Sequence, residues 1–179
     1  MTKKKPEIVI DQILLNQREL FLYDSVTQES AQKLIKEIIV LDSKKHAPIN
    51  LWINSPGGNV TAGLAIINIM KSVKSKITTI VNSEACSMAS QISIVGDKRI
   101  ITANGFWMAH DMSGGITGDY LGKVKYRAKY LEKLFDVLEE DYKKYTKLTK
   151  KDLEIARNGE LWLNAEQCLE KGIVDKILK

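Results

Sequence analysis

The feature that most restricts the fold of this chain is a regular alternation of short apolar segments with segments of helical periodicity. Asn50–Ile53 and Ile77–Val81 have the length and the β-branched composition of buried strands. Between them, apolar residues recur at helical spacing to about Val73, and Thr61 is the expected N-cap. Because this β-α-β-α-β order needs crossover connections, we expect an α/β fold with a mostly parallel sheet. Further strands are predicted at 19–23, 98–102 and 106–109, an extended segment at 8–15, and further helices at 28–43 and 87–94.

The C-terminal part of the chain has a different character. Tyr120–Tyr145 is rich in charge, and its apolar residues fall mostly three and four positions apart, so we predict one helix of about 25 residues. A helix of this length either packs across the domain or projects to meet a partner. Shorter helices are predicted at Lys150–Arg157 and Asn164–Lys171, the second ended by Gly172. The length of 179 residues suits a single domain, residues 1–179.

Charge and cysteine content argue against several classes of function. The net charge is +5, but the lysines are dispersed and no aromatic residues interleave them, so a solvated basic surface is favoured over a nucleic-acid partner. Cys86 and Cys168 have no metal-ligand spacing and are expected as reduced, buried thiols. No segment has the pattern of a membrane span or a signal peptide. We therefore expect a cytoplasmic protein without a membrane partner, a metal or another cofactor.

Three segments at the ends of predicted strands are candidates for chemistry. Asn54–Gly58, with the sequence Asn-Ser-Pro-Gly-Gly, is an unusual turn, Ser87 follows Gly58 by 29 positions at a predicted helix start, and His110 ends an apolar strand. A serine nucleophile needs a base and donors for the oxyanion, and glycine amides and a helix N-terminus supply such donors. Each feature also has a purely structural interpretation: a tight turn, an N-cap and a structural histidine. Together they indicate acyl-transfer chemistry.

Several motifs, in the same order, resemble those of the Clp protease family of proteolytic subunits. The resemblance runs from about Ile13 to the C-terminus, and the interval from Gly58 to Ser87 matches that of the family without a gap. It implies a ClpP/crotonase-like β-α-β superhelix with a protruding helical handle over about residues 113–146. The matching motifs are Asn54-Ser55-Pro56-Gly57-Gly58, Thr61-Ala62-Gly63, Ala85-Cys86-Ser87-Met88, Met108-Ala109-His110, Leu163-Asn164-Ala165 and Gly172-Ile173-Val174-Asp175.

The resemblance also implies an activity, a serine endopeptidase that cleaves unfolded polypeptides. Ser87 would be the nucleophile and His110 the general base, with the backbone amides of Gly58 and Met88 as the oxyanion hole. An extended substrate would lie between Gly58-Asn59-Val60 and the stretch Asp111, Met112 and Ser113. Heptameric rings would stack through the handle into a tetradecamer and enclose a chamber. A Clp-type AAA+ unfoldase would supply this chamber with unfolded polypeptide.

The sequence departs from the family pattern at three places. Counting back from Trp162-Leu163-Asn164-Ala165 puts Glu160 where the family has its triad aspartate, so Glu160 is the predicted third member, with Asn158 as the alternative. Asp111-Met112 follow His110, where the family has Gln-Pro. About a dozen residues precede Ile13, whereas the family has an axial loop there, which leaves docking of an unfoldase open.

Three alternatives share parts of this pattern. A bacteriophage-type maturation peptidase would use the same chemistry. A crotonase-type acyl-CoA enzyme has a related fold and also uses glycine amides as an oxyanion hole, but no acyl-CoA site is recognisable here. A catalytically degenerate ring scaffold is kept open by the unusual acid, Glu160.

Overall fold

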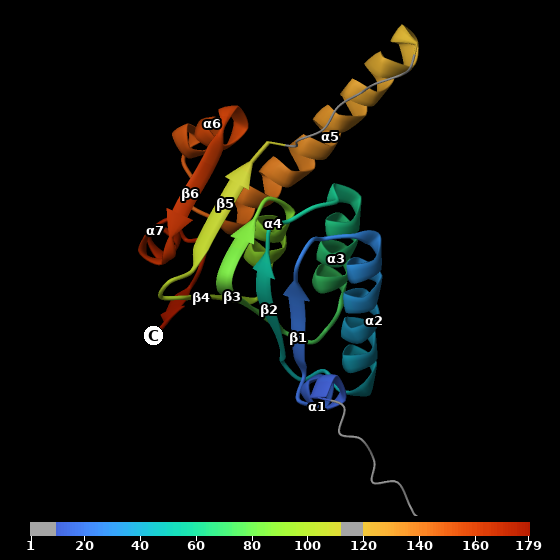
Figure 1. Cartoon of the computed structure of the whole chain (residues 1–179), viewed down its shortest axis with the longest axis vertical. Coiled ribbons are helices and arrows are strands. Elements are labelled where there is room, and N and C mark those ends of the chain that lie inside the picture. The colour runs from blue at the N-terminus through green and yellow to red at the C-terminus, as the bar shows by residue number, and fades with distance from the viewer. Residues whose placement is uncertain (1–9, 112–119) are drawn as a thin grey trace, which may run out of the picture.

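The computed structural model describes residues 10–111 and 120–179, which form an α/β fold around one central sheet (Figure 1). Strands and helices alternate through most of the chain, as the sequence predicts. The strands are β1 (Glu19–Tyr23), β2 (Ile49–Ser55), β3 (Ile77–Cys86), β4 (Lys98–Thr102), β5 (Phe106–His110), β6 (Glu160–Asn164) and β7 (Lys176–Leu178). The helices are α1 (Ile10–Asn16), α2 (Gln28–Lys44), α3 (Val60–Ser72), α4 (Met88–Ile94), α5 (Leu121–Tyr145), α6 (Lys150–Asn158) and α7 (Ala165–Glu170).

Strand β3 is the longest strand and organises the sheet. The strand order is β1-β2-β3-β4-β7, and these neighbours all pair in parallel. The first half of β3 pairs with β4, through Thr78–Val81, and its last residues, Glu84–Cys86, pair with β5. Strand β6 then pairs antiparallel with β5. The end of β3 and the end of β5 are thereby brought together, and these ends carry Ser87 and His110.

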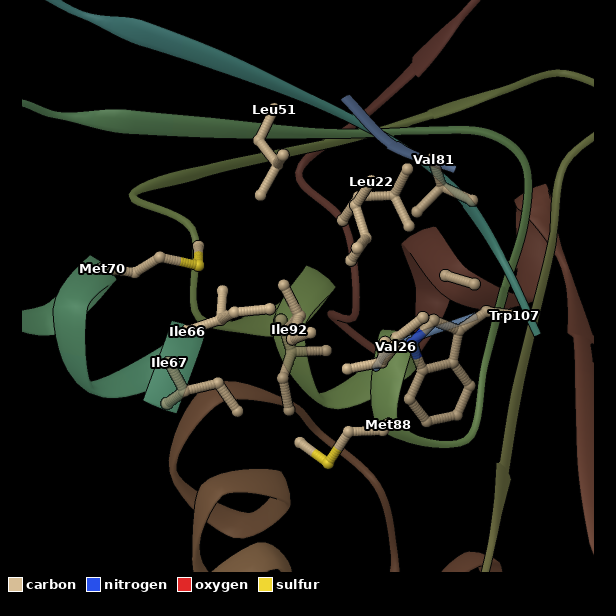
Figure 2. Packing of buried hydrophobic residues seen from close by; sticks show 14 of the residues in the cluster. Leu22, Val26, Leu51, Ile66, Ile67, Met70, Val81, Met88, Ile92 and Trp107 are labelled. Carbon is tan, nitrogen blue, oxygen red and sulfur yellow. The ribbon is translucent and has the colours of Figure 1, made fainter. Parts of the chain in front are cut away.

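The hydrophobic core lies between the sheet and helices α2, α3 and α4. Side chains that alternate along β2 are buried, as expected for a strand with one face on a core. Figure 2 shows how side chains of α3 and α4 meet those of the strands within this core. Its labelled members include Ile66, Ile67 and Met70 of α3, Met88 and Ile92 of α4, Leu22, Leu51 and Val81 of the strands, and Trp107 of β5.

Helix α5 confirms the predicted long helix and has 25 residues. Its buried residues, Leu138, Asp141 and Tyr142, all lie near its C-terminal end, where it packs against α4. The rest of the helix projects away from the sheet (Figure 1). The start of the predicted handle, residues 113–119, lies outside the described residues. Nowhere in the ranges 10–111 and 120–179 does a helix combine the length and the hydropathy needed to cross a bilayer.

Three predictions about local structure were wrong or incomplete. The segment 8–15 was expected to be extended, but from Ile10 it forms α1, because Ile10, Ile13 and Leu14 have helical spacing. Asn59, rather than Thr61, caps α3: its side chain accepts a hydrogen bond from the amide of Ala62. Strand β6 was not predicted as a strand.

Candidate active site

Ser87 lies in the turn between the end of β3 and the start of α4. Its backbone has φ 53° and ψ −121°, a combination that L-residues rarely adopt. Its amide donates to the carbonyl oxygen of Met108 at 2.8 Å, which ties the turn to β5. Ser87 precedes the helix, yet its side chain makes no capping hydrogen bond. The N-cap interpretation therefore fails, and the strained backbone presents a hydroxyl that is not committed to the helix.

A buried hydrogen-bond network lies under this turn and fixes it. The hydroxyl of Ser90 donates to the carbonyl oxygen of Ser87 at 2.6 Å, so the 3.1 Å contact with Tyr142 must use the proton of Tyr142. Burial raises the pKa of Tyr142 to about 12, although its side-chain hydrogen bonds with Ser90 and Gln91 oppose that shift. Tyr142 therefore stays protonated and donates at neutral pH. The base of α5 thus helps to hold the turn that carries Ser87.

The turn after β2 packs directly against Ser87. Gly57 has φ 89°, and a Cβ there would lie 2.5 Å from the carbonyl oxygen of Cys86 and 2.7 Å from Cβ of Ser87. Val26 pairs with Gly58 through two hydrogen bonds, one to the carbonyl of Gly57 and one from the amide of Asn59. This pattern leaves the amide of Gly58 pointing away from Val26. Only glycine allows the two turns to approach this closely.

Two backbone amides next to Ser87 have no acceptor among the described residues. One is the amide of Gly58, and the other is the amide of Met88, the first residue of α4. The first amides of a helix have no partner within the helix, and they attract negative charge. An oxyanion that forms beside Ser87 is therefore offered two donors from two different turns.

His110 ends β5 and pairs in register with Glu160 at the start of β6. Directly opposed residues of an antiparallel pair project from the same face of the sheet, so both side chains lie on one side. However, Glu160 accepts a hydrogen bond from Nε1 of Trp162 at 2.8 Å, and the part of the chain that is described provides no hydrogen bond to the imidazole of His110. Asn158 is engaged elsewhere, because its side chain donates to the carbonyl of Glu154 at 2.9 Å.

Cys86 immediately precedes Ser87 but is not suited to act as a nucleophile. The residue is buried, and its thiol lies 3.9 Å from the carboxylate of Glu84. Burial, followed by the negative charges of Glu84 and Glu160, raises the pKa of this thiol to about 12. Both cysteines are free and buried, which confirms that part of the sequence prediction. The described residues also contain no group of three or more His, Cys, Asp or Glu side chains placed to hold a metal ion.

One pocket gathers most of the predicted site. It contains Ser87, Met88, Gly58 and His110, which come from three separate segments of the sequence. Two of the predicted substrate-binding residues, Val60 and Asp111, also line it, whereas Asn59 and Glu160 do not, and Met112 and Ser113 lie outside the described residues. The remaining lining residues were not predicted as site residues: Gln91 of α4, and Phe135, Leu138 and Tyr142 of α5.

A sequence signal existed for only one of these missed residues. Gln91 lies four positions after Ser87, so the two share one face of a helix. The three residues of α5 follow about fifty positions later, and no local pattern relates them to the serine.

An α/β sheet, a strained serine at a strand–helix turn, two free amides and a histidine in the same pocket define a protein of the serine-type peptidase class. A family model described as Clp protease matches residues 3–179, almost the whole chain. The chain belongs to the Clp protease family.

Its relatives carry the same description. A protein of Deinococcus radiodurans named ATP-dependent Clp protease proteolytic subunit is 32% identical over 168 residues, 92% of this chain and 82% of the relative. A protein of Chlamydia trachomatis serovar D named ATP-dependent Clp protease proteolytic subunit 1 is 34% identical, with coverage of 97% and 93%. The proteolytic subunit 2 of Prochlorococcus marinus is 32% identical, with coverage of 90% and 82%.

Proposed function

We propose that this protein is a serine endopeptidase in which Ser87 attacks the peptide carbonyl and His110 accepts its proton. The amides of Gly58 and Met88 stabilise the oxyanion. The observation that carries the proposal is that one pocket contains all four groups while both amides lack an acceptor among the described residues. A donor of this kind typically contributes about 10²- to 10³-fold in turnover.

Glu160 is the third member of the proposed triad. Its support is the register, which pairs it with His110. The carboxylate must leave Trp162 before it can orient the imidazole, because it accepts the indole hydrogen bond at 2.8 Å. A catalytically degenerate scaffold is the second candidate, and this same contact is the observation that favours it.

The substrate is an unfolded polypeptide held as an extended strand along Asn59, Val60 and Asp111. The proposed contacts also include Met112 and Ser113, which lie outside the described residues. Backbone pairing of this kind reads few side chains and accepts many sequences. Val60 and Asp111 line the pocket, which supports this path.

The chain is proposed to work as a single domain in heptameric rings that stack into a tetradecamer through the handle at about residues 113–146. The projection of α5, with exposed Tyr126 and Tyr130, supports a contact there. Fourteen chains of 20.2 kDa have a mass of about 280 kDa. Because the relatives are named ATP-dependent, a Clp-type AAA+ unfoldase is the proposed partner, and the free thiols suit a cytoplasmic location.

A combined experiment tests these points on the purified protein. A fluorophosphonate probe should label Ser87, an unstructured peptide should be cleaved, and light scattering should give about 280 kDa. Labelling with no cleavage of any peptide would leave the scaffold candidate in place. No labelling, or acyl-CoA turnover, would reject the serine mechanism, and a monomer would reject the chamber.

A further inference from the structure

The carbonyl oxygen of the Gln91 side chain is buried and has no hydrogen-bond donor. Gln91 is 2% exposed, and its Oε1 lacks a partner among the described residues. The orientation of the amide is fixed, because Nε2 donates to the carbonyl oxygen of Leu138 at 3.2 Å, and a carbonyl can only accept from the NH2 end. Buried acceptors are normally paired in folded proteins, so this one needs an explanation.

The hydroxyl of Tyr142, which lies in the same pocket, is already used. Its proton goes to Oγ of Ser90, whose own proton goes to the carbonyl of Ser87. Tyr142 therefore has no second proton to offer to Gln91. Within the described residues Oε1 stays unpaired, on a residue that lines the pocket.

The position of the pocket decides which part of a substrate enters it. In a bound peptide, the carbon next to the attacked carbonyl bears the P1 side chain, on the amino side of the scissile bond. A pocket lined by Ser87, Gly58 and Met88 is therefore placed to receive that side chain. Val60, Phe135 and Leu138 make much of its wall apolar, and its cavity volume is about 60 Å³.

We propose that Gln91 is a specificity-determining residue of this pocket, and that it selects P1 side chains with a neutral hydrogen-bond donor at the end of an apolar stem. Glutamine and tyrosine have this chemistry. Methionine and phenylalanine fill similar space but leave Oε1 unpaired, and a site built to bond a donor rejects the analogue that lacks it. A lysine ammonium would lose its hydration and gain one neutral acceptor in return. The proposal rests on the proposed serine peptidase function.

The test measures kcat/KM for two matched peptide pairs that differ only at P1: glutamine against methionine, and tyrosine against phenylalanine. We expect the wild-type protein to favour the donor-bearing member of each pair by about tenfold, the size of one hydrogen bond to a buried acceptor. Gln91→Met should abolish or reverse both preferences. Gln32→Met makes the same chemical change on the exposed face of α2 and should leave both ratios unchanged.

Labelling by a fluorophosphonate probe separates this proposal from the proposed function. Labelling and cleavage with equal rates within both pairs would overturn the role of Gln91 and leave the serine mechanism intact. A preference for P1 lysine would also overturn it and would assign selectivity to Asp111, which lines the same pocket. Absence of labelling and of cleavage would overturn both proposals. The two wild-type ratios decide the question even if Gln91→Met does not fold.

Discussion

The two halves of the candidate site are built in different ways. The half that carries Ser87 is packed between two tight turns and is supported from below by Ser90 and Tyr142. The half that carries His110 and Glu160 is a two-stranded ribbon at the edge of the sheet, and Glu160 is exposed and bonded to Trp162. The difference shows that the positions of Ser87 and of the two amides are set by the fold, whereas those of His110 and Glu160, the proposed acid–base pair, depend on side-chain hydrogen bonds that can change partners.

Preorganised donors need no rearrangement when charge develops, and such donors usually supply the largest single contribution to catalysis. The imidazole of His110 has no hydrogen-bond partner among the described residues and must first be oriented, so the proposed acid–base half is where activation is expected to occur. Variants that disturb each half separately therefore test the contrast.

The largest effect is expected at the nucleophile. Ser87→Ala should lower kcat/KM by about 10⁴- to 10⁶-fold, because loss of a triad nucleophile leaves only the oxyanion hole and binding. Steady-state cleavage of an unstructured peptide, with fluorophosphonate labelling in parallel, measures this change. Retention of more than about a hundredth of the wild-type rate would remove Ser87 from the mechanism.

Ser87→Gly serves as the matched variant for the strained backbone. Both variants remove the hydroxyl, but only glycine adopts φ 53° without strain. We expect Ser87→Gly to exceed Ser87→Ala in unfolding free energy by about 1 kcal/mol, measured by denaturant unfolding. Equal stabilities would mean that the turn is not strained.

The second effect is expected at the acid. Glu160→Ala should lower kcat by about 10⁴-fold, less than the full loss expected for the nucleophile variant, because the carboxylate only orients and stabilises His110. The control is Asn158→Ala, which removes a side chain whose one hydrogen bond within the described residues goes to the carbonyl of Glu154 and should leave kcat unchanged. A full rate in Glu160→Ala would remove Glu160 from the triad.

Trp162→Phe tests the half of the site that carries His110 and Glu160 by a change that is expected to raise kcat. This variant removes the indole donor that holds the carboxylate of Glu160 at 2.8 Å and frees it to turn toward His110. We expect kcat to rise by about two- to fivefold, the size of one released surface hydrogen bond. A fall in kcat would show that the indole contact belongs to the active arrangement.

A smaller effect on kcat is expected from loss of the hydrogen bond between Tyr142 and Ser90, beneath the turn that carries Ser87. Tyr142→Phe removes the donor to Ser90 and should lower the unfolding free energy by about 1 kcal/mol, with a loss of kcat of only a few fold. Tyr23→Phe, which removes an exposed hydroxyl that accepts a hydrogen bond from Asn82, is the control and should change both quantities less. If both variants behave alike, the Tyr142–Ser90 contact does not position the turn.

The sequence predicted which residues gather around Ser87 better than it predicted the walls of the pocket. The meeting of Ser87, Gly58 and Met88 in one pocket could be predicted because each lies within a few residues of a turn whose composition is unusual; their catalytic roles stay predictions. The register of β5 with β6 places Glu160 opposite His110; the triad role that counting from Trp162 gives to Glu160 stays a prediction. The contact of Trp162 with Glu160 was not foreseen, because hydrogen bonds between exposed side chains have no sequence pattern.

The walls of the pocket were hidden for a different reason. Phe135, Leu138 and Tyr142 read in the sequence as the apolar stripe of an amphipathic helix, and the packing of the base of α5 against α4 decides that they face Ser87. The same limit applies to α1, whose spacing is helical but whose length is too short for a secure prediction.

The smallest effect at neutral pH is expected from thiol reagents. The pKa of Cys86 is raised to about 12, mainly by burial, so the nucleophilic thiolate is scarce at pH 8. N-ethylmaleimide at pH 8 should therefore leave peptidase activity unchanged, under conditions in which a fluorophosphonate abolishes it. Rapid inactivation by the thiol reagent would instead show that the wall beside Ser87 opens, and that the nucleophile half is less rigid than the acid–base ribbon.

The sign of the alkaline response follows from the same raised pKa values. Cys86, Cys168 and Tyr142 have pKa values of about 12 in the folded protein, against ordinary values of 9.0 for cysteine and 10.0 for tyrosine. The unfolded chain therefore loses protons first as pH rises above about 9, so the folded state should lose stability from there toward pH 12. Thermal unfolding between pH 7 and 11 measures this, and Cys86→Ala should reduce the slope. A flat profile would mean that these groups ionise without unfolding, and that water reaches the base of the nucleophile turn.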